Sequence, residues 1–180
     1  MSDYRRYYLP NHFVFITVVT HNRNDILIKN VELLRHCMLK TKEKFVFDIF
    51  AIVVLPNHFH IIIKPENIEE FSVIIGSIKR RFTKSLDEKF KDMDISESKI
   101  KRKEKGVWQR RFYEHLIRSE KDLHNHLDYI HFNPVKHGYI QNVKDWKYSS
   151  FKKFVNLGNY DINWGSFPDD IKHLEILNYE

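Results

Sequence analysis

The strongest constraint on the fold is a pair of apolar stretches separated by a single turn. Residues 45–55 and 58–64 are rich in β-branched and aromatic side chains, and the Pro56-Asn57 pair stands between them. Such side chains favour strands, and proline followed by asparagine is typical of turns. The sequence therefore predicts a β-hairpin. Because the first stretch is almost wholly apolar, we expect it to lie at the centre of a sheet, covered on both faces.

The flanking segments alternate between strand and helix patterns. Residues 13–20 are β-branched and aromatic and predict a strand. Residues 31–43 carry apolar side chains at helical spacing after Asn30, a candidate N-cap. A second helical pattern begins after Asn67, behind the hairpin, with one apolar and one basic face.

Two more elements complete the predicted order. Residues 107–118 read as a fourth strand, and Ser119 begins another helix. We expect this helix to end at Asn133-Pro134, because a residue before proline avoids the helical region. The first six elements match the ferredoxin-like βαββαβ plan, an α+β fold with an antiparallel sheet and two helices on one face. The seventh is an added C-terminal helix.

The length of 180 residues predicts one domain with an appendage. We expect residues 1–155 to form that domain. Residues 87–106 are almost all charged and are expected to be an excursion from it. Residues 156–180 hold one lysine and five acids, which indicates an acidic tail packed on the domain or extending from it.

Charge and aromatic content favour a nucleic-acid partner. The net charge is +6 although residues 156–180 contribute −4, so the remaining chain carries +10, and 14% of residues are aromatic. Lysine and arginine bind phosphates, and aromatic rings stack on unpaired bases. The apolar runs are much shorter than the roughly 20 residues that span a membrane, and no apolar signal segment follows the N-terminus. We expect a cytoplasmic protein without a membrane partner.

The clearest candidate chemistry is His58-Phe59-His60. Side chains alternate along a strand, so both histidines point to one face, about 6.5–7 Å apart at their Cα atoms. Two imidazoles at this spacing can share a metal ion, although two structural histidines would have the same pattern. A nucleotide hydrolase with alternating histidines would have a third histidine where Ile62 stands, so that class is disfavoured.

A second candidate pair lies on the last predicted helix. Tyr129 and Asn133 are four residues apart and therefore share one helical face. His126 precedes Tyr129 by three residues and is either a proton acceptor or simply exposed. From spacing alone, the simpler interpretation is a surface tyrosine near a helix end.

Taken together, these motifs resemble a known family. Two segments about 70 residues apart resemble the single-tyrosine HUH transposases, and more narrowly the REP-associated tyrosine transposases: Leu55-Pro-Asn-His-Phe-His-Ile61 and His126-Leu-Asp-Tyr-Ile-His-Phe-Asn-Pro-Val-Lys-His-Gly138. Three further segments resemble that subgroup: Tyr4-Arg-Arg-Tyr-Tyr8, residues 107–115 and Trp146-Lys-Tyr-Ser-Ser150.

The resemblance implies a metal-dependent single-stranded DNA endonuclease and strand transferase with a covalent 5′-phosphotyrosine intermediate. It implies that Tyr129 is the nucleophile and that His58, His60 and Asn133 hold a divalent cation, Mg²⁺ or Mn²⁺. The wider insertion-sequence families usually have glutamine at the position of Asn133. The implied partner is single-stranded DNA with hairpin (REP-like) ends, bound by a monomer or a homodimer. Replication initiators and relaxases share the chemistry but often carry a third histidine or paired tyrosines.

Basic and aromatic segments supply candidate DNA contacts. For each of them, a solvated face or a docked tail remains the alternative. The N-terminal group could read a short guide sequence by stacking and base-edge contacts. A second functional class also stays open, a non-cutting, sequence-specific DNA-hairpin-binding regulator derived from a transposase. The candidate contacts are Tyr4, Arg5, Arg6, Lys79, Arg80, Arg81, Lys84, Arg110 and Arg111.

Overall fold

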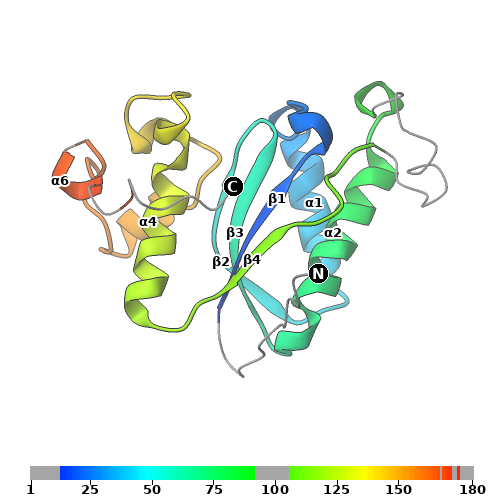
Figure 1. Cartoon of the computed structure of the whole chain (residues 1–180), viewed down its shortest axis with the longest axis horizontal. Coiled ribbons are helices and arrows are strands. Elements are labelled where there is room, and N and C mark those ends of the chain that lie inside the picture. Colours follow the sequence, from blue (N-terminus) through cyan, green and yellow to red (C-terminus); the bar gives the residue numbers. More distant parts are fainter. Residues whose placement is uncertain (1–12, 92–105, 167, 172–173, 175–180) are drawn as a thin grey trace, which may run out of the picture.

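A computed structural model describes residues 13–91, 106–166, 168–171 and 174 of the chain. Within these residues a single antiparallel sheet has the strand order β2-β3-β1-β4 (Figure 1). The order along the chain and the order in the sheet are those of the ferredoxin-like α+β fold, which confirms the predicted fold class. The strands are β1 (Val14–Val19), β2 (Phe47–Val54), β3 (His58–Pro65) and β4 (Tyr113–Leu116).

Helices cover both faces of the sheet (Figure 1). α1 (Val31–Lys42) and α2 (Phe71–Ser85) pack on one face, and α4 (Glu120–Lys136) packs on the other. Two short helices, α5 (Phe151–Asn156) and α6 (Pro168–Ile171), follow. None of the helices in the described ranges has the length and apolar content needed to cross a membrane.

Alternation along the strands separates two cores. Ile16, Phe59 and Ile61 belong to the core under α1 and α2. Phe15 and Ile62 belong to the core under α4. β3 is therefore buried on both faces, and the core under α4 includes Tyr129 and Ile130 of that helix.

The prediction that the first hairpin strand lies at the centre of the sheet is wrong, because β2 is an edge strand. Its outer edge is covered by a segment from the C-terminal region. The Val54 N–H donates to the Tyr148 carbonyl at 2.9 Å, and the Ser150 N–H donates to the Ile52 carbonyl at 2.8 Å. This cover satisfies the exposed backbone groups, so the edge strand can be apolar.

The prediction that the last helix ends at Asn133-Pro134 is also wrong. α4 continues through Pro134, at the cost of one backbone hydrogen bond, and ends at Lys136. Gly138 has a positive φ of 72°, and the Gly138 and Tyr139 N–H groups donate to the Val135 and Pro134 carbonyls. This pairing is a Schellman motif, which ends the helix one turn later than predicted.

Two smaller differences concern the local predictions, and a third prediction is not tested. The strand expected over residues 107–118 is reduced to β4, although Trp108 forms an isolated bridge with Thr20. Asn30 precedes α1, but its side chain donates to the Ile26 carbonyl and does not cap the helix. Most of the charged segment 87–106 lies outside the described residues.

Candidate active site

His58 and His60 lie at the start of β3 on the face covered by α4. Both side chains are buried, and their ring centroids are 4.9 Å apart. Phe59 between them packs into the opposite core, against α1 and α2. The strand therefore presents the two imidazoles side by side to α4, as the alternation predicts.

Hydrogen bonds orient both imidazole rings. The Asn57 Nδ2 group donates to the Asp25 carboxylate at 3.0 Å, which leaves Asn57 Oδ1 to accept from His58 Nδ1 at 2.7 Å. The neutral ring of His58 then carries its lone pair on Nε2. His60 Nδ1 shares a 2.8 Å hydrogen bond with Thr17 Oγ1. In both rings Nδ1 is thus hydrogen-bonded and Nε2 is the second ring nitrogen. Metal-binding histidines usually have such a hydrogen bond on the nitrogen that does not bind the metal.

One face of α4 lies opposite the two histidines. The Tyr129 ring is 5.2 Å from the His60 ring, and the His137 ring, two turns later, is 5.2 Å from the His58 ring. Asn133 is four residues from each and therefore lies between them on the same helical face. The two halves of the candidate site, which are far apart in the sequence, meet across the interface between β3 and α4.

Asn133 is fully buried, and neither of its amide atoms forms a hydrogen bond with any described residue. Leaving a buried amide without a partner costs about 1–3 kcal/mol, so such a group in a native protein needs an explanation. An amide oxygen that binds an ion is one such explanation.

Lys136 was not among the residues predicted from the sequence. Its ammonium nitrogen lies 3.4 Å from the Tyr129 hydroxyl and 4.8 Å from the centre of the Tyr129 ring. A positive charge at this distance stabilises a negatively charged phenolate oxygen. The seven-residue spacing from Tyr129, two helical turns, could have suggested the contact if the helix had been extended past Pro134.

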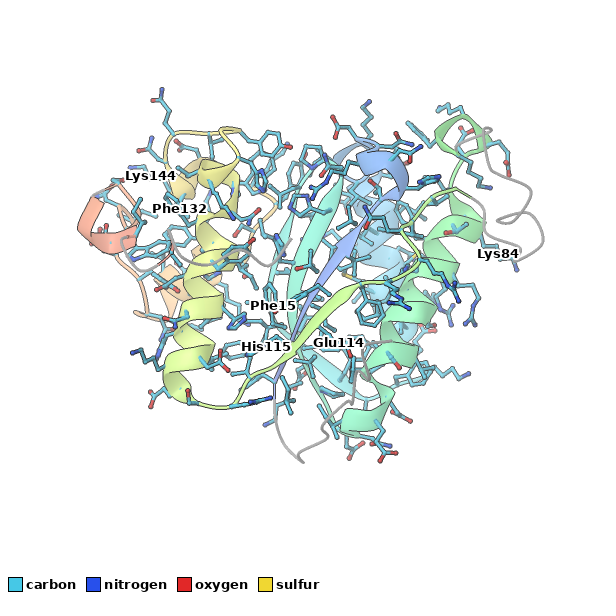
Figure 2. All side chains as sticks on the ribbon, viewed as in Figure 1. Phe15, Lys84, Glu114, His115, Phe132 and Lys144 are labelled. Atoms are coloured by element: carbon cyan, nitrogen blue, oxygen red, sulfur yellow. The ribbon has the colours of Figure 1, made fainter. Side chains whose placement is uncertain are left out.

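His126 is buried, so the interpretation of this residue as exposed is wrong. It belongs to a cluster with His115 and Asp122, whose ligand atoms all lie within 4.8 Å of one another. The Phe15 ring is 4.7 Å from the His126 ring and 5.7 Å from the His60 ring, so it lies beside both groups. Figure 2 shows Phe15 and His115 near each other between α4 and the sheet.

The cluster has the donors of a metal site but is already linked by hydrogen bonds. His115 Nε2 is 2.9 Å from an Asp122 carboxylate oxygen, and His126 Nδ1 is 2.8 Å from the Asp122 carbonyl. Burial raises the pKa of the Asp122 carboxyl, but the bonds from His115 and the Arg118 N–H outweigh it and leave that pKa lowered. Burial lowers the pKa of His126. The cluster connects His115 of β4 to Asp122 and His126 of α4, and His126 lies one turn before Tyr129.

His131 is a buried histidine with a structural role. Its Nε2 atom is 3.0 Å from the Ser150 hydroxyl, which also accepts from the Ile52 N–H. Burial lowers the pKa of His131 to about 3. The side chain is therefore neutral in the folded protein and joins α4 to the segment that covers β2.

We expect His131 to make the protein acid-sensitive. The folded pKa lies below the unfolded value of about 6.5, so the stabilising contribution is complete above pH 6.5 and is lost as the pH falls. The loss should approach about 1.4 kcal/mol per pH unit below 6.5. Urea unfolding at pH 6.5 and pH 5.0 measures it, with His131→Gln as a non-titrating comparison. Equal pH dependence in wild type and His131→Gln would contradict this assignment, since other groups with lowered pKa values, such as His126 and Asp122, would then account for the effect.

The structure divides the basic residues predicted to contact DNA. Lys79 donates to the Gln109 and Arg110 carbonyls at 2.8 and 3.4 Å, so it holds the segment before β4 against α2. Arg81 is half-buried, and its charge acts on Cys37 of α1. The exposed members are Arg80, Lys84, Arg110 and Arg111, while Tyr4, Arg5 and Arg6 lie outside the described residues.

The exposed basic side chains of α2 lie away from α4. Lys84 is on α2, on the opposite side of the sheet from α4 (Figure 2). Any DNA that contacts both Lys84 and Tyr129 must therefore extend around the sheet. The role of all these residues in DNA binding stays a prediction.

Comparisons with known proteins show the family to which this chain belongs. The family model described as "Transposase IS200 like" matches residues 6–133. A REP-associated tyrosine transposase of Escherichia coli is 40% identical over 172 residues, which cover 94% of each chain. A Haemophilus influenzae protein provisionally described in the same terms is 42% identical over 171 residues, 94% of this chain and 96% of that protein.

A solved structure gives the same result. It is described as a REP-associated tyrosine transposase bound to a REP hairpin, and it matches with a TM-score of 0.74 and 39% identity over 92% of each chain. The chain belongs to the IS200-like transposase family. Within that family its resemblance to the REP-associated tyrosine transposases, predicted from the motifs, is confirmed.

Proposed function

We propose that this transposase is a metal-dependent endonuclease and strand transferase. It cuts single-stranded DNA beside a hairpin and forms a covalent 5′-phosphotyrosine at Tyr129. The observation that carries the proposal is the contact between Tyr129 and His60. One turn further along the same helix lies the Asn133 amide, which has no hydrogen-bond partner among the described residues. The hairpin-bound structure of a protein 39% identical to this chain supports the choice of substrate.

The proposed reaction conserves the energy of the phosphodiester bond. The Tyr129 hydroxyl loses its proton to solvent, and its oxygen forms a bond to phosphorus. The bond from phosphorus to the 3′ oxygen breaks, and a proton from solvent completes the released 3′-hydroxyl. A 3′-hydroxyl from another strand later attacks the same phosphorus and releases the tyrosine. Covalent catalysis of this kind rejoins strands without a nucleoside triphosphate.

His58, His60 and Asn133 would hold the divalent cation. The donors would be the two Nε2 atoms and the Asn133 Oδ1 atom, a mixed nitrogen and oxygen set. When bound, a divalent cation polarises the scissile phosphate and balances charge that develops in the transition state. Mg²⁺ prefers oxygen ligands, so we expect Mn²⁺ to bind this set more tightly in vitro.

Lys136 and His60 would prepare Tyr129 for attack. The Lys136 ammonium group lies beside the phenol oxygen and favours its ionised form. Contact with His60 keeps the phenol next to the proposed ligands, and the continuous α4 helix sets the distance between Tyr129 and Asn133. Such positioning lowers the entropy cost of bringing the phenol oxygen and the scissile phosphate into the reactive geometry.

The direct test uses purified wild-type protein and single-stranded hairpin DNA with unpaired flanks. We expect a detergent-resistant protein–DNA adduct with Mn²⁺, none with EDTA, and none on the fully paired duplex.

The non-cutting regulator is the second candidate function, and it is favoured by one observation: Tyr129 is only 2% exposed. Metal-independent hairpin binding without any adduct would support the regulator and reject the nuclease.

A further inference from the structure

A row of aromatic rings extends from the candidate active site across the surface beside α4. The row consists of His137, Tyr139, Trp146 and Tyr148, and its first ring lies 5.2 Å from His58. Successive ring centroids along the row are 6.0, 5.7 and 5.8 Å apart. These residues follow the Tyr129 helix in sequence, and their rings take no part in the proposed cleavage chemistry.

Two residues of the aromatic row, Trp146 and Tyr148, are fixed to strand β2. The Trp146 indole N–H donates to the Val54 carbonyl at 3.0 Å, and the Tyr148 carbonyl accepts from the Val54 N–H at 2.9 Å. The Tyr139 ring is stacked on Trp146 with an interplanar angle of 29° and is 41% exposed. The exposed Tyr139 ring is therefore held in place by the fixed Trp146 ring. Such preorganisation lowers the entropy cost of binding a planar group.

Positive charge accompanies the aromatic row. Lys136 and Lys147 both have exposed side chains. The Lys147 ammonium group lies 4.9 Å from the Tyr148 ring, at the far end of the row, whereas Lys136 lies beside Tyr129 at the near end. Aromatic rings flanked by cations are typical of surfaces that bind single-stranded nucleic acid, since the rings stack on bases and the cations bind phosphates.

We propose that the aromatic row is a stacking path for the unpaired nucleotides that adjoin the scissile phosphate. This inference rests on the proposed function, because it places that phosphate near Tyr129 and His58. Tyr139, the accessible ring of the row, would receive a base directly. Paired stem bases cannot use the row, because their faces are covered within the duplex. Since every base has an aromatic face, we expect little sequence preference here.

The test measures binding in EDTA, so it does not depend on cleavage. Fluorescence anisotropy compares a hairpin without a tail with the same hairpin carrying four unpaired nucleotides, on the 5′ side in one probe and on the 3′ side in another. Tyr139→Ala should weaken binding of at least one tailed probe by about 10-fold or more. It should leave the affinity for the untailed hairpin within about twofold, since the path takes no stem base.

Tyr139→Phe is the matched control and should bind like wild type, because it keeps the ring. The inference is overturned if Tyr139→Ala binds all three probes like wild type, or weakens all three equally. It is also overturned if Tyr139→Phe weakens binding as much as Tyr139→Ala. If the tail-dependent loss is found in a protein that forms no adduct, the stacking path holds and the proposed nuclease activity fails.

Discussion

Tyr129→Phe is expected to abolish formation of the covalent protein–DNA adduct, with a loss of at least about 10³-fold in rate. The substitution removes only the nucleophilic oxygen. The ring contacts with His60 and Phe15 and the position of the Lys136 ammonium group over the ring do not depend on that oxygen. Hairpin affinity and the free energy of unfolding should therefore stay close to those of wild type.

Two labels on the DNA make this test specific. The proposed linkage joins the protein to the fragment that carries the 5′-phosphate, so a label at the 3′ end of the substrate should migrate with the protein. A label at the 5′ end should appear on a released fragment with a free 3′-hydroxyl. Tyr139→Phe, which removes the hydroxyl of a nearby exposed tyrosine, should still form the adduct. Adduct formation by Tyr129→Phe would mean that another residue is the nucleophile.

The fold could be predicted from local patterns because strand alternation and helical spacing are properties of neighbouring residues. The hairpin around Pro56-Asn57 and the helix α1 follow from such patterns. The place of β2 in the sheet could not be predicted in this way. It depends on Ser150, about a hundred residues later, in a segment with little periodicity of its own.

The candidate site was predictable in part for the same reason. The shared face of His58 and His60 is set by strand geometry, and that of Tyr129 and Asn133 by helix geometry. Their meeting depends on the packing of α4 on the opposite face from α1 and α2, which no local pattern specifies. Only the family resemblance linked the two pairs before the structure did.

The wrong prediction for the end of α4 is the reason that Lys136 was not predicted as a site residue. Because α4 was expected to end at Asn133-Pro134, Lys136 lay outside the predicted helix and its alignment with Tyr129 was not considered. Helical periodicity also overstated the basic face of α2. It grouped Lys79 with exposed cations, whereas its ammonium group donates to the carbonyls of Gln109 and Arg110.

The substitution Asn133→Leu separates the role of Asn133 in metal binding from its effect on stability. Asn133→Leu should stabilise the metal-free protein by about 1–3 kcal/mol, because leucine of similar size replaces a buried amide that has no hydrogen-bond partner among the described residues. Mn²⁺ that binds only the folded protein raises the free energy of unfolding. Asn133→Leu removes one of the proposed metal donors, so Mn²⁺ should no longer stabilise this variant. Urea unfolding in EDTA and in Mn²⁺ measures both effects.

Asn133→Asp serves as the opposite control for the metal ligand. It keeps an oxygen donor but buries a carboxylate, so it should be less stable than wild type in EDTA and should gain more stability from Mn²⁺. Two results would contradict the assignment of Asn133. Lower stability of Asn133→Leu than wild type in EDTA would mean that the amide has a partner in solution. Equal Mn²⁺ stabilisation of Asn133→Leu and wild type would exclude Asn133 as a ligand, and His58 and His60 would then need a different third donor.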